Sequence, residues 1–233
     1  MKILSVLFLL SAFSVSVHST VTPEEFESIR HLRDGEFKSQ LRSLLSKGQR
    51  SLGYKSAKKV MFEKLDNFDG EVCGVYSANY CLRTRSIPNN SAMNTEHTWP
   101  QSKGAVGIAK SDLHHLYPTK SKINSTRSNY PFCYVANVKW EGSVSKMGQD
   151  KDGTMCFEVP DFHKGNVARA MFYFAVRYSH NISDSEEKVL REWNEIDPVD
   201  DAEVERERKI ENHQNNTNLF VLYPEIINQI SDI

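Results

Sequence analysis

Long apolar runs are almost absent from this 233-residue chain. The exception is the segment 3–17, which is nearly all apolar or serine; Lys2 precedes it and Ser19 follows as a small residue suited to cleavage. This arrangement predicts a signal peptide over residues 1–19 and a mature chain that starts near Thr20. A run of roughly 15 residues is shorter than the ~20 that a spanning helix needs, so a membrane anchor is the weaker alternative. We therefore expect a secreted or periplasmic protein with no membrane contact after cleavage.

Cysteine is scarce as well. The chain has four cysteines, and none forms a Cys-x-x-Cys pair, which argues against a structural zinc site. An even number in an exported chain favours two disulfides, for which three pairings are possible. We expect Cys73–Cys81 and Cys133–Cys156, because each bond then joins near neighbours in the sequence. Each bond would contribute about 3 kcal/mol through the unfolded state.

A surplus of positive charge is also missing, since 29 Lys and Arg stand against 30 Asp and Glu. The net charge of −1 by itself argues against a nucleic-acid partner, but the distribution of charge matters more. The stretch 103–127 contains a single acid, Asp112, whereas 183–211 is strongly acidic. We therefore expect one basic face on a nearly neutral molecule. Its basic residues are Lys103, Lys110, Lys120, Lys122 and Arg127.

Neither internal repeats nor low-complexity segments occur, and about 210 mature residues suit one domain, which we expect to be monomeric. Apolar spacing predicts an α+β fold that is mostly helical, with a small antiparallel sheet. Helices are expected at 23–45, 54–65, 166–178, 183–196 and 201–213. Strands are expected at 72–76, 94–99, 113–117, 132–138 and 154–159. Ser183 and Glu186 fit a capping box, and Glu203 with Arg206 fits a structural ion pair.

The segment 94–127 is expected to run strand, loop, strand and helix. Pro100 would end the first strand and Pro118 the second. Thr119 is the expected N-cap of the helix that follows. Trp99 is expected in the core. This local order matters because the segment also holds the residues with the most chemistry.

Phosphodiester hydrolysis needs a base for the attacking water and a cation for the charged phosphorus centre. Glu96 and Asn124 offer the oxygen ligands that Mg²⁺ prefers, and His97 is a natural base near neutral pH. Arg127 follows Asn124 by three residues, so a helix places both on one side, where Arg127 would bind phosphate or form a structural ion pair. Adjacent residues of a regular strand point to opposite faces. Glu96 and His97 can therefore face one ion only if the strand ends or bulges there, and Pro100 favours an ending.

Three motifs in this order resemble the bacterial endonuclease I family: Thr95-Glu96-His97-Thr98-Trp99-Pro100-Gln101-Ser102, Asp112-Leu113-His114-His115-Leu116, and Asn124-x-x-Arg127-Ser128-Asn129. Weaker matches extend the resemblance over roughly residues 54–222, for example Gly165-Asn166-Val167-Ala168-Arg169 and Asp197-Pro198-Val199. The resemblance implies a nuclease domain over 20–233 built around a ββα-metal (His-Me finger) motif at about 93–129. It implies His97 as the general base and Glu96 and Asn124 as metal ligands. It also implies Mg²⁺, with Mn²⁺ or Ca²⁺ tolerated, and cleavage of DNA and often RNA with little sequence preference, leaving 5′-phosphates.

The chain departs from the family between Ser102 and Asp112. Some relatives carry a long insertion there, whose arginine contacts the product phosphate, and this chain has no counterpart. Lys103, Arg85 and Arg127 remain open as substitutes, and we expect Lys103 and Lys122 to bind substrate.

Asp112, His114 and His115 are expected to support the site structurally rather than to react. Two other functions stay open. One is a secreted zinc hydrolase that uses His97, His114 and His115, although the chain lacks a His-Glu-x-x-His motif. The other is a secreted disulfide-bonded binding protein without catalysis.

Overall fold

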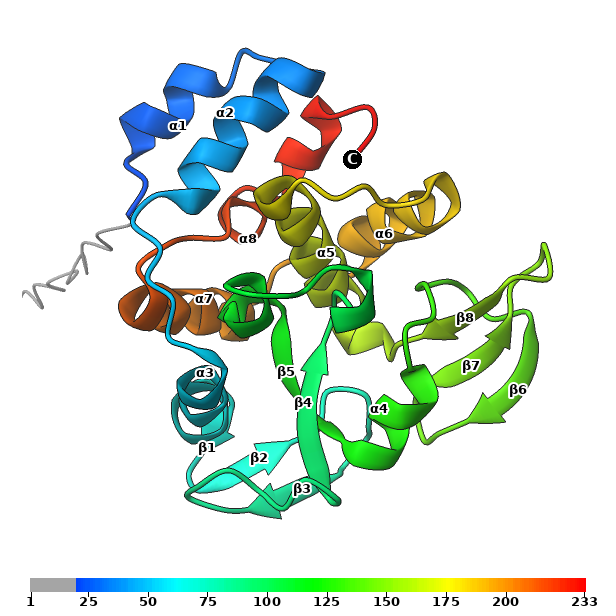
Figure 1. Ribbon diagram of the computed structural model, residues 1–233. Coiled ribbons are helices and arrows are strands. Elements are labelled where there is room, and N and C mark those ends of the chain that lie inside the picture. Colours follow the sequence, from blue (N-terminus) through cyan, green and yellow to red (C-terminus); the bar gives the residue numbers. More distant parts are fainter. Residues whose placement is uncertain (1–19) are drawn as a thin grey trace, which may run out of the picture.

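The computed structural model describes residues 20–233, so the predicted signal peptide lies outside the described residues (Figure 1). The helices are α1 (Pro23–Ile29), α2 (Asp34–Ser46), α3 (Tyr54–Val60), α4 (Ser121–Arg127), α5 (Lys164–Tyr178), α6 (Asp184–Ile196), α7 (Asp201–Gln214) and α8 (Leu219–Leu222). The strands are β1 (Asn67–Phe68), β2 (Glu71–Cys73), β3 (Cys81–Arg83), β4 (Met93–His97), β5 (Leu116–Lys120), β6 (Asn137–Glu141), β7 (Lys146–Gln149) and β8 (Met155–Glu158). The α+β prediction is confirmed. Within residues 20–233, every helix is too short or too polar to cross a bilayer.

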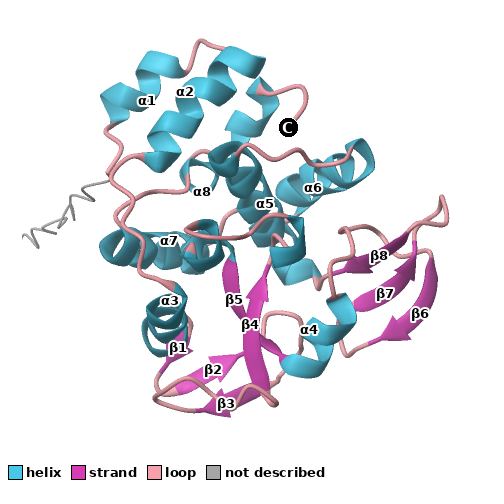
Figure 2. Ribbon diagram, viewed as in Figure 1, coloured by secondary structure: helices cyan, strands magenta, loops and turns pink. Residues whose placement is uncertain are grey.

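The strands form three separate antiparallel sheets. Their strand orders are β1-β2-β3, β4-β5 and β6-β7-β8. In the view of Figure 2, most helices occupy the upper half of the molecule and the sheets occupy the lower half. The β4–β5 hairpin runs from the β1-β2-β3 sheet toward the helices, with α3 on one side and α4 on the other (Figure 1). The hairpin therefore connects the helical core to the outer sheets.

Helix α5 is the centre of the core. Its residues are apolar on nearly all sides, and the helix packs against α2, α6 and α8. Phe172, Tyr173 and Phe174 are fully buried. Each large side chain of this kind stabilises the fold by roughly 1.5–3 kcal/mol relative to its exposed state. The helix predicted at 166–178 is confirmed, and it anchors the hairpin because Trp99 stacks on Phe174 with ring centroids 4.9 Å apart.

The β4–β5 hairpin corrects several local expectations. Strand β4 ends at His97, two residues before the expected end at Trp99. An end at this position is what Glu96 and His97 need if both are to face one site. Pro118 does not end a strand: it lies inside β5, opposite Thr95. A two-stranded sheet leaves β5 with a free edge, so the missing N–H of proline costs little there. The Pro118 carbonyl instead accepts a hydrogen bond from the Val75 N–H at 3.0 Å.

The second predicted strand starts later than expected. Leu113–His115 forms a 3₁₀ turn, because the Asp112 side chain accepts a hydrogen bond from the His114 N–H and caps the turn. Thr119 is part of β5 and is not the N-cap of α4; Lys120 takes that position without a side-chain hydrogen bond. The chain reaches α4 directly from the strand.

Two charged interactions also differ from the prediction. Ser183 lies at the N-cap of α6 but its side chain makes no capping hydrogen bond, and Glu186 accepts from the Phe132 N–H instead. Glu203 and Arg206 do not pair with each other. Glu203 pairs with Arg169 at 2.5 Å, and Arg206 pairs with Asp66 at 2.8 Å. In each case a distant partner replaces the neighbour along the sequence.

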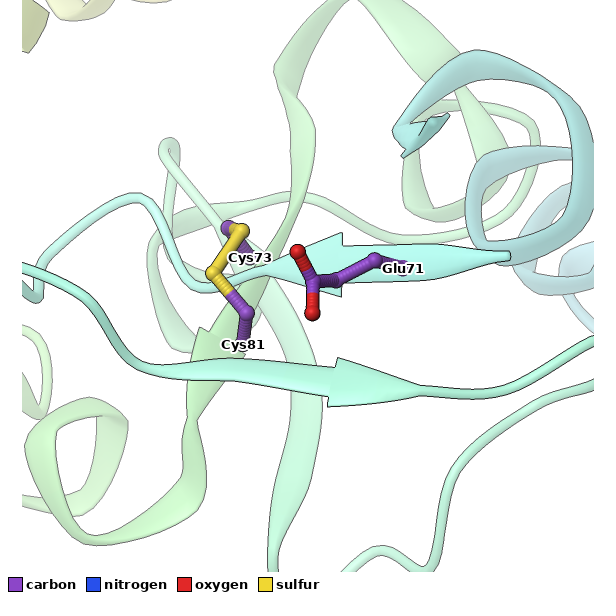
Figure 3. Close-up of side chains that lie close together, drawn as sticks. All are labelled: Glu71, Cys73 and Cys81. Atoms are coloured by element: carbon purple, nitrogen blue, oxygen red, sulfur yellow. A yellow bond between two sulfur atoms is a disulfide. The ribbon is translucent and has the colours of Figure 1, made fainter. Parts of the chain in front are cut away.

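Both predicted disulfides are present. Cys73–Cys81 joins β2 to β3, and Cys133–Cys156 joins the segment after α4 to β8. The Glu71 carboxylate lies beside the first disulfide (Figure 3), with ligand-type atoms of the three residues within 4.8 Å of one another. Both sulfur atoms are bonded to each other, so neither is a thiolate that could hold a metal. We therefore assign this group a structural role.

Candidate active site

A cleft of about 420 Å³ opens at the end of β4. It lies between that strand end, the 3₁₀ turn Gln101–Lys103 and helix α4. The structure places Glu96, His97 and Asn124 together in its wall. The other lining residues are Thr95, Pro100, Gln101, Ser102, Ser128 and Asn129. Because β4 ends at His97, two adjacent side chains that a regular strand would separate both face this cleft.

Glu96 is held in one orientation by two partners. Its Oε1 accepts a hydrogen bond from the Tyr76 hydroxyl at 3.1 Å and lies 3.3 Å from Arg127 Nε. Its Oε2 receives no hydrogen bond from residues 20–233 and is the oxygen available to a ligand. Burial raises the pKa of Glu96 to about 7, although Arg127 and Tyr76 each lower it. Burial outweighs both partners because the residue is only 1% exposed.

Asn124 is also held in one orientation. Its Nδ2 donates hydrogen bonds to Asn94 Oδ1 at 2.8 Å and to the Thr95 carbonyl at 3.1 Å. Both amide hydrogens are therefore used, and Oδ1 is left as the only group that can bind something new. Helix α4 supplies this residue and hairpin strand β4 supplies both acceptors. The cleft thus contains two fixed oxygen atoms without donors, one from each element.

His97 has one ring nitrogen that can act as an acceptor. Its Nε2 lies 3.1 Å from the Lys110 carbonyl oxygen, which can only accept, so Nε2 carries the hydrogen. Nδ1 is then an acceptor, and Gln101 Nε2 donates to it across 3.4 Å. Burial, and secondarily the neighbouring His115, lowers the pKa of His97 to about 3. The imidazole is therefore neutral at pH 7.

Arg127 lies behind the cleft rather than in it. Its side chain is 1% exposed, and its guanidinium donates to the Thr98 carbonyl at 2.8 Å and to the Ser128 carbonyl at 3.0 Å. The guanidinium also lies over the Phe132 ring, 4.6 Å from its centroid. This placement matches the ion-pair alternative for Arg127. A direct contact with a phosphate would require the guanidinium to leave these partners.

The other two histidines do not line the cleft. His115 Nε2 donates to the Ala109 carbonyl at 2.7 Å, and burial lowers the pKa of His115 to about 4. Burial also lowers the pKa of His114, but Glu207 and Asp112 together outweigh burial, so the pKa lies above its usual value; His114 Nδ1 lies 3.1 Å from Glu207 Oε2. The imidazoles of His97, His114 and His115 thus take three separate partners. They do not converge as zinc ligands would.

Asp112 is fully buried and accepts hydrogen bonds through both oxygens. Burial raises its pKa, but the nearby His114 and His115 and its hydrogen-bond donors outweigh burial, so the pKa lies below its usual value. The donors to Oδ2 are Tyr178 at 2.6 Å, Tyr173 at 2.8 Å and Gln49 at 3.0 Å. The donors to Oδ1 are Gln214 at 2.7 Å and the His114 N–H at 3.1 Å. The carboxylate thus ties the 3₁₀ turn to α5 and to the end of α7.

Lys103 and Lys122 are exposed and lie near the cleft without lining it. Lys103 closes the 3₁₀ turn on one wall, and its carbonyl accepts from Trp99 Nε1 at 2.9 Å. Lys122 lies in the first turn of α4, two residues before Asn124.

For two residues at the site, the sequence gives no indication of the contacts they make. Tyr76 was expected in a strand of the scaffold, yet its hydroxyl holds Glu96. Gln101 belongs to a quoted motif, but nothing in the motif shows that its amide meets the imidazole of His97. Both contacts join different elements, so they depend on the tertiary fold.

Comparison with known proteins gives three informative relatives. An extracellular ribonuclease of Bacillus subtilis (strain 168) is 37% identical over 158 residues, which cover 59% of this chain and 53% of the relative. Endonuclease-1 of Buchnera aphidicola subsp. Acyrthosiphon pisum (strain APS) is 35% identical over 112 residues, covering 48% of this chain and 44% of the relative. An extracellular deoxyribonuclease of Aeromonas hydrophila is 30% identical over 121 residues, covering 47% of this chain and 48% of the relative.

The chain spans about half the length of the curated relatives it matches. A family model described as Endonuclease I matches residues 33–225, a range that contains the whole cleft and all three motifs. This match covers most of the chain, and the chain therefore belongs to the endonuclease I family.

Proposed function

We propose that this protein is a secreted or periplasmic metal-dependent endonuclease that hydrolyses phosphodiester bonds of DNA or RNA. One observation carries the proposal: Glu96 Oε2, Asn124 Oδ1 and His97 Nδ1 all belong to residues that line one cleft. The names of the relatives support it, because they include both a ribonuclease and deoxyribonucleases.

The donor set fits a hard divalent cation. One carboxylate oxygen and one amide oxygen suit Mg²⁺, which binds through few protein ligands and keeps several waters, and Mn²⁺ or Ca²⁺ have similar preferences. Glu96 and Asn124 would hold the ion, and Tyr76 and Asn94 would fix those two side chains in turn. The bound cation would supply charge neutralisation at the phosphate and at the leaving oxygen.

His97 would act as the general base. The Lys110 carbonyl fixes the hydrogen on Nε2, so Nδ1 takes the proton of the attacking water. Gln101 donates to Nδ1 in the absence of substrate, so its amide must yield that position to the water. Its carbonyl oxygen can then accept the second hydrogen of the same water. This chain would therefore position the water from two sides.

Substrate contacts are expected at phosphates rather than at bases. Contacts to phosphates carry no sequence information, so we propose little sequence preference. From the family resemblance we also propose products with 5′-phosphates. Lys103 and Lys122 would hold flanking phosphates, and a monomer contains the complete site.

A zymogram tests the proposed function. The chain is run in gels that contain DNA or RNA and is renatured with EDTA, with Mg²⁺ or with Zn²⁺. We expect clearing with Mg²⁺ and none with EDTA, and the Mg²⁺ products should be ligatable through a 5′-phosphate. Clearing restored by Zn²⁺ alone would instead support the zinc hydrolase, and no clearing in any lane would support a binding protein.

Tyr76→Phe should weaken Mn²⁺ or Mg²⁺ binding by about 10-fold, because a group that orients a metal ligand typically contributes this much. The ring would still pack on Phe157, whose centroid is 5.4 Å away, so only the hydroxyl that holds Glu96 is lost. Titration calorimetry with Mn²⁺ measures the affinity directly. Tyr134→Phe removes a hydroxyl far from the cleft and should leave the affinity unchanged. Equal Mn²⁺ affinity of the Tyr76→Phe variant and the wild type would remove Tyr76 from the site.

A further inference from the structure

A second cluster of functional groups adjoins the cleft. Tyr54, the first residue of α3, has its ring centroid 5.4 Å from that of His97. Lys58 Nζ and Lys110 Nζ each lie over the Tyr54 ring, 4.9 Å from its centroid. Lys58 follows Tyr54 by one helical turn, so both project from one side of α3. Lys110 comes from the 3₁₀ turn Ala109–Ser111, which packs against α3.

These two ammonium groups are not neutralised. In the described part of the chain, no carboxylate lies within ion-pair distance of Lys58 or Lys110. Lys59 on the same helix differs, because its Nζ lies 4.0 Å from Glu63 Oε2. A tyrosine ring attracts each cation by only about 0.5–1 kcal/mol at an exposed site, so it does not replace a counter-ion. The cluster therefore concentrates positive charge that an anion would balance.

We infer that Tyr54, Lys58 and Lys110 form a phosphate-binding subsite for the nucleic-acid strand on the His97 side of the cleft. This inference rests on the proposed function and deepens it. The ligand is a phosphodiester group next to the one that is cleaved. The lysines bind it as point charges, and the tyrosine ring holds them in place beside the base.

The position of the cluster favours a polymer over a free anion. In Figure 1, α3 and α4 flank the β4–β5 hairpin on opposite sides. Lys122 is an exposed residue of α4, the helix on the opposite side of the hairpin from α3 (Figure 1). A strand that crosses the end of the hairpin therefore meets ammonium groups before and after His97. Phosphates repeat along a nucleic-acid strand, so one chain can contact both flanks at once.

Two matched double variants test the subsite. Lys58→Ala/Lys110→Ala removes the two cluster charges, and Lys55→Ala/Lys59→Ala removes two charges from α3 outside the cluster. Binding of a fluorescent single-stranded DNA oligonucleotide is measured by anisotropy in EDTA, so that no cleavage occurs. We expect the first variant to bind about 10-fold more weakly and the control to bind within about two-fold of the wild type. The slope of log Kobs against log salt should fall by about 0.7 in magnitude for the first variant, since the cluster binds one phosphate and each phosphate neutralised on a single strand accounts for about 0.7.

Steady-state kinetics with Mg²⁺ and two single variants of Tyr54 complete the test. KM should rise about 10-fold for Lys58→Ala/Lys110→Ala while kcat stays within about two-fold, because binding rather than chemistry is lost. Tyr54→Phe keeps the ring and should bind DNA like the wild type, whereas Tyr54→Leu should bind more weakly.

The outcomes separate the subsite from the proposed function. Equal weakening by both double variants, or by neither, overturns the subsite even if the wild type digests nucleic acid. Binding that depends on Lys58 and Lys110 without any digestion in Mg²⁺ supports the subsite and overturns the nuclease.

Discussion

Replacing His97 by alanine should lower kcat for phosphodiester cleavage by about 10²- to 10⁴-fold, the usual contribution of a positioned general base. The reason is that only one ring nitrogen can accept a proton: Nε2 donates to the Lys110 carbonyl, and Nδ1 is the acceptor at the cleft. His115, whose ring centroid lies 5.4 Å from that of His97, cannot take over, because its Nε2 is bonded to the Ala109 carbonyl and the residue is fully buried. Initial rates on a labelled oligonucleotide at saturating Mg²⁺ give the ratio.

Two further variants separate chemistry from structure. His97→Gln places an amide nitrogen near the position of Nε2 and can still donate to the Lys110 carbonyl, but it supplies no base, so it should be as inactive as the alanine variant. His213→Ala removes an imidazole outside the cleft and should cleave at the wild-type rate. All three should bind the oligonucleotide in EDTA as the wild type does. If His97→Ala retains more than about a tenth of the wild-type kcat, the base lies elsewhere.

Asp112→Ala should reduce the free energy of unfolding by about 3–5 kcal/mol, the range expected when one partner of a buried charged network is removed. Five donors meet this carboxylate, among them Tyr173, Tyr178 and Gln214. Truncation leaves these donors in a dry core without an acceptor and also leaves a void. Urea unfolding with the disulfides intact measures the change.

The controls for Asp112 distinguish charge from shape. Asp112→Asn keeps the volume of the side chain but places an amide group where only hydrogen-bond donors point. Its loss of unfolding free energy should therefore lie between zero and that of the alanine variant. Asp152→Ala removes an exposed carboxylate in a turn and should change the stability by less than about 0.5 kcal/mol. A loss below about 1.5 kcal/mol for Asp112→Ala would show that the neighbouring donors find other acceptors.

The sequence was sufficient to predict elements whose conformation is determined by neighbouring residues. The apolar residues of α5 predict a helix whatever surrounds it, and the near-neighbour cysteines pair as expected. Local signals failed where a distant group decides the conformation. Pro118 stays in a strand because the sheet leaves its nitrogen at a free edge and Val75 uses its carbonyl. Leu113–His115 turns instead of extending because Asp112 caps it.

The same division applies to the site. Glu96, His97 and Asn124 were predicted from motifs, and the end of β4 allows the first two to share a cleft. The environment of these residues could not be predicted from the sequence, because it is formed by elements that lie far apart along the chain. Tyr76 lies 20 residues from the carboxylate that it holds. The burial of Arg127 likewise depends on packing against Phe132, which helical spacing does not reveal.

The paired restraints on the two oxygen donors have a kinetic consequence. Tyr76 and Arg127 lock the Glu96 carboxylate, and both hydrogens of the Asn124 amide are already used. Neither side chain needs to rotate before it can coordinate a cation. In the proposed enzyme, the rate of metal capture would therefore be set by how fast the hydrated ion sheds its water, and exchange of the ion would proceed without any rearrangement of the polypeptide.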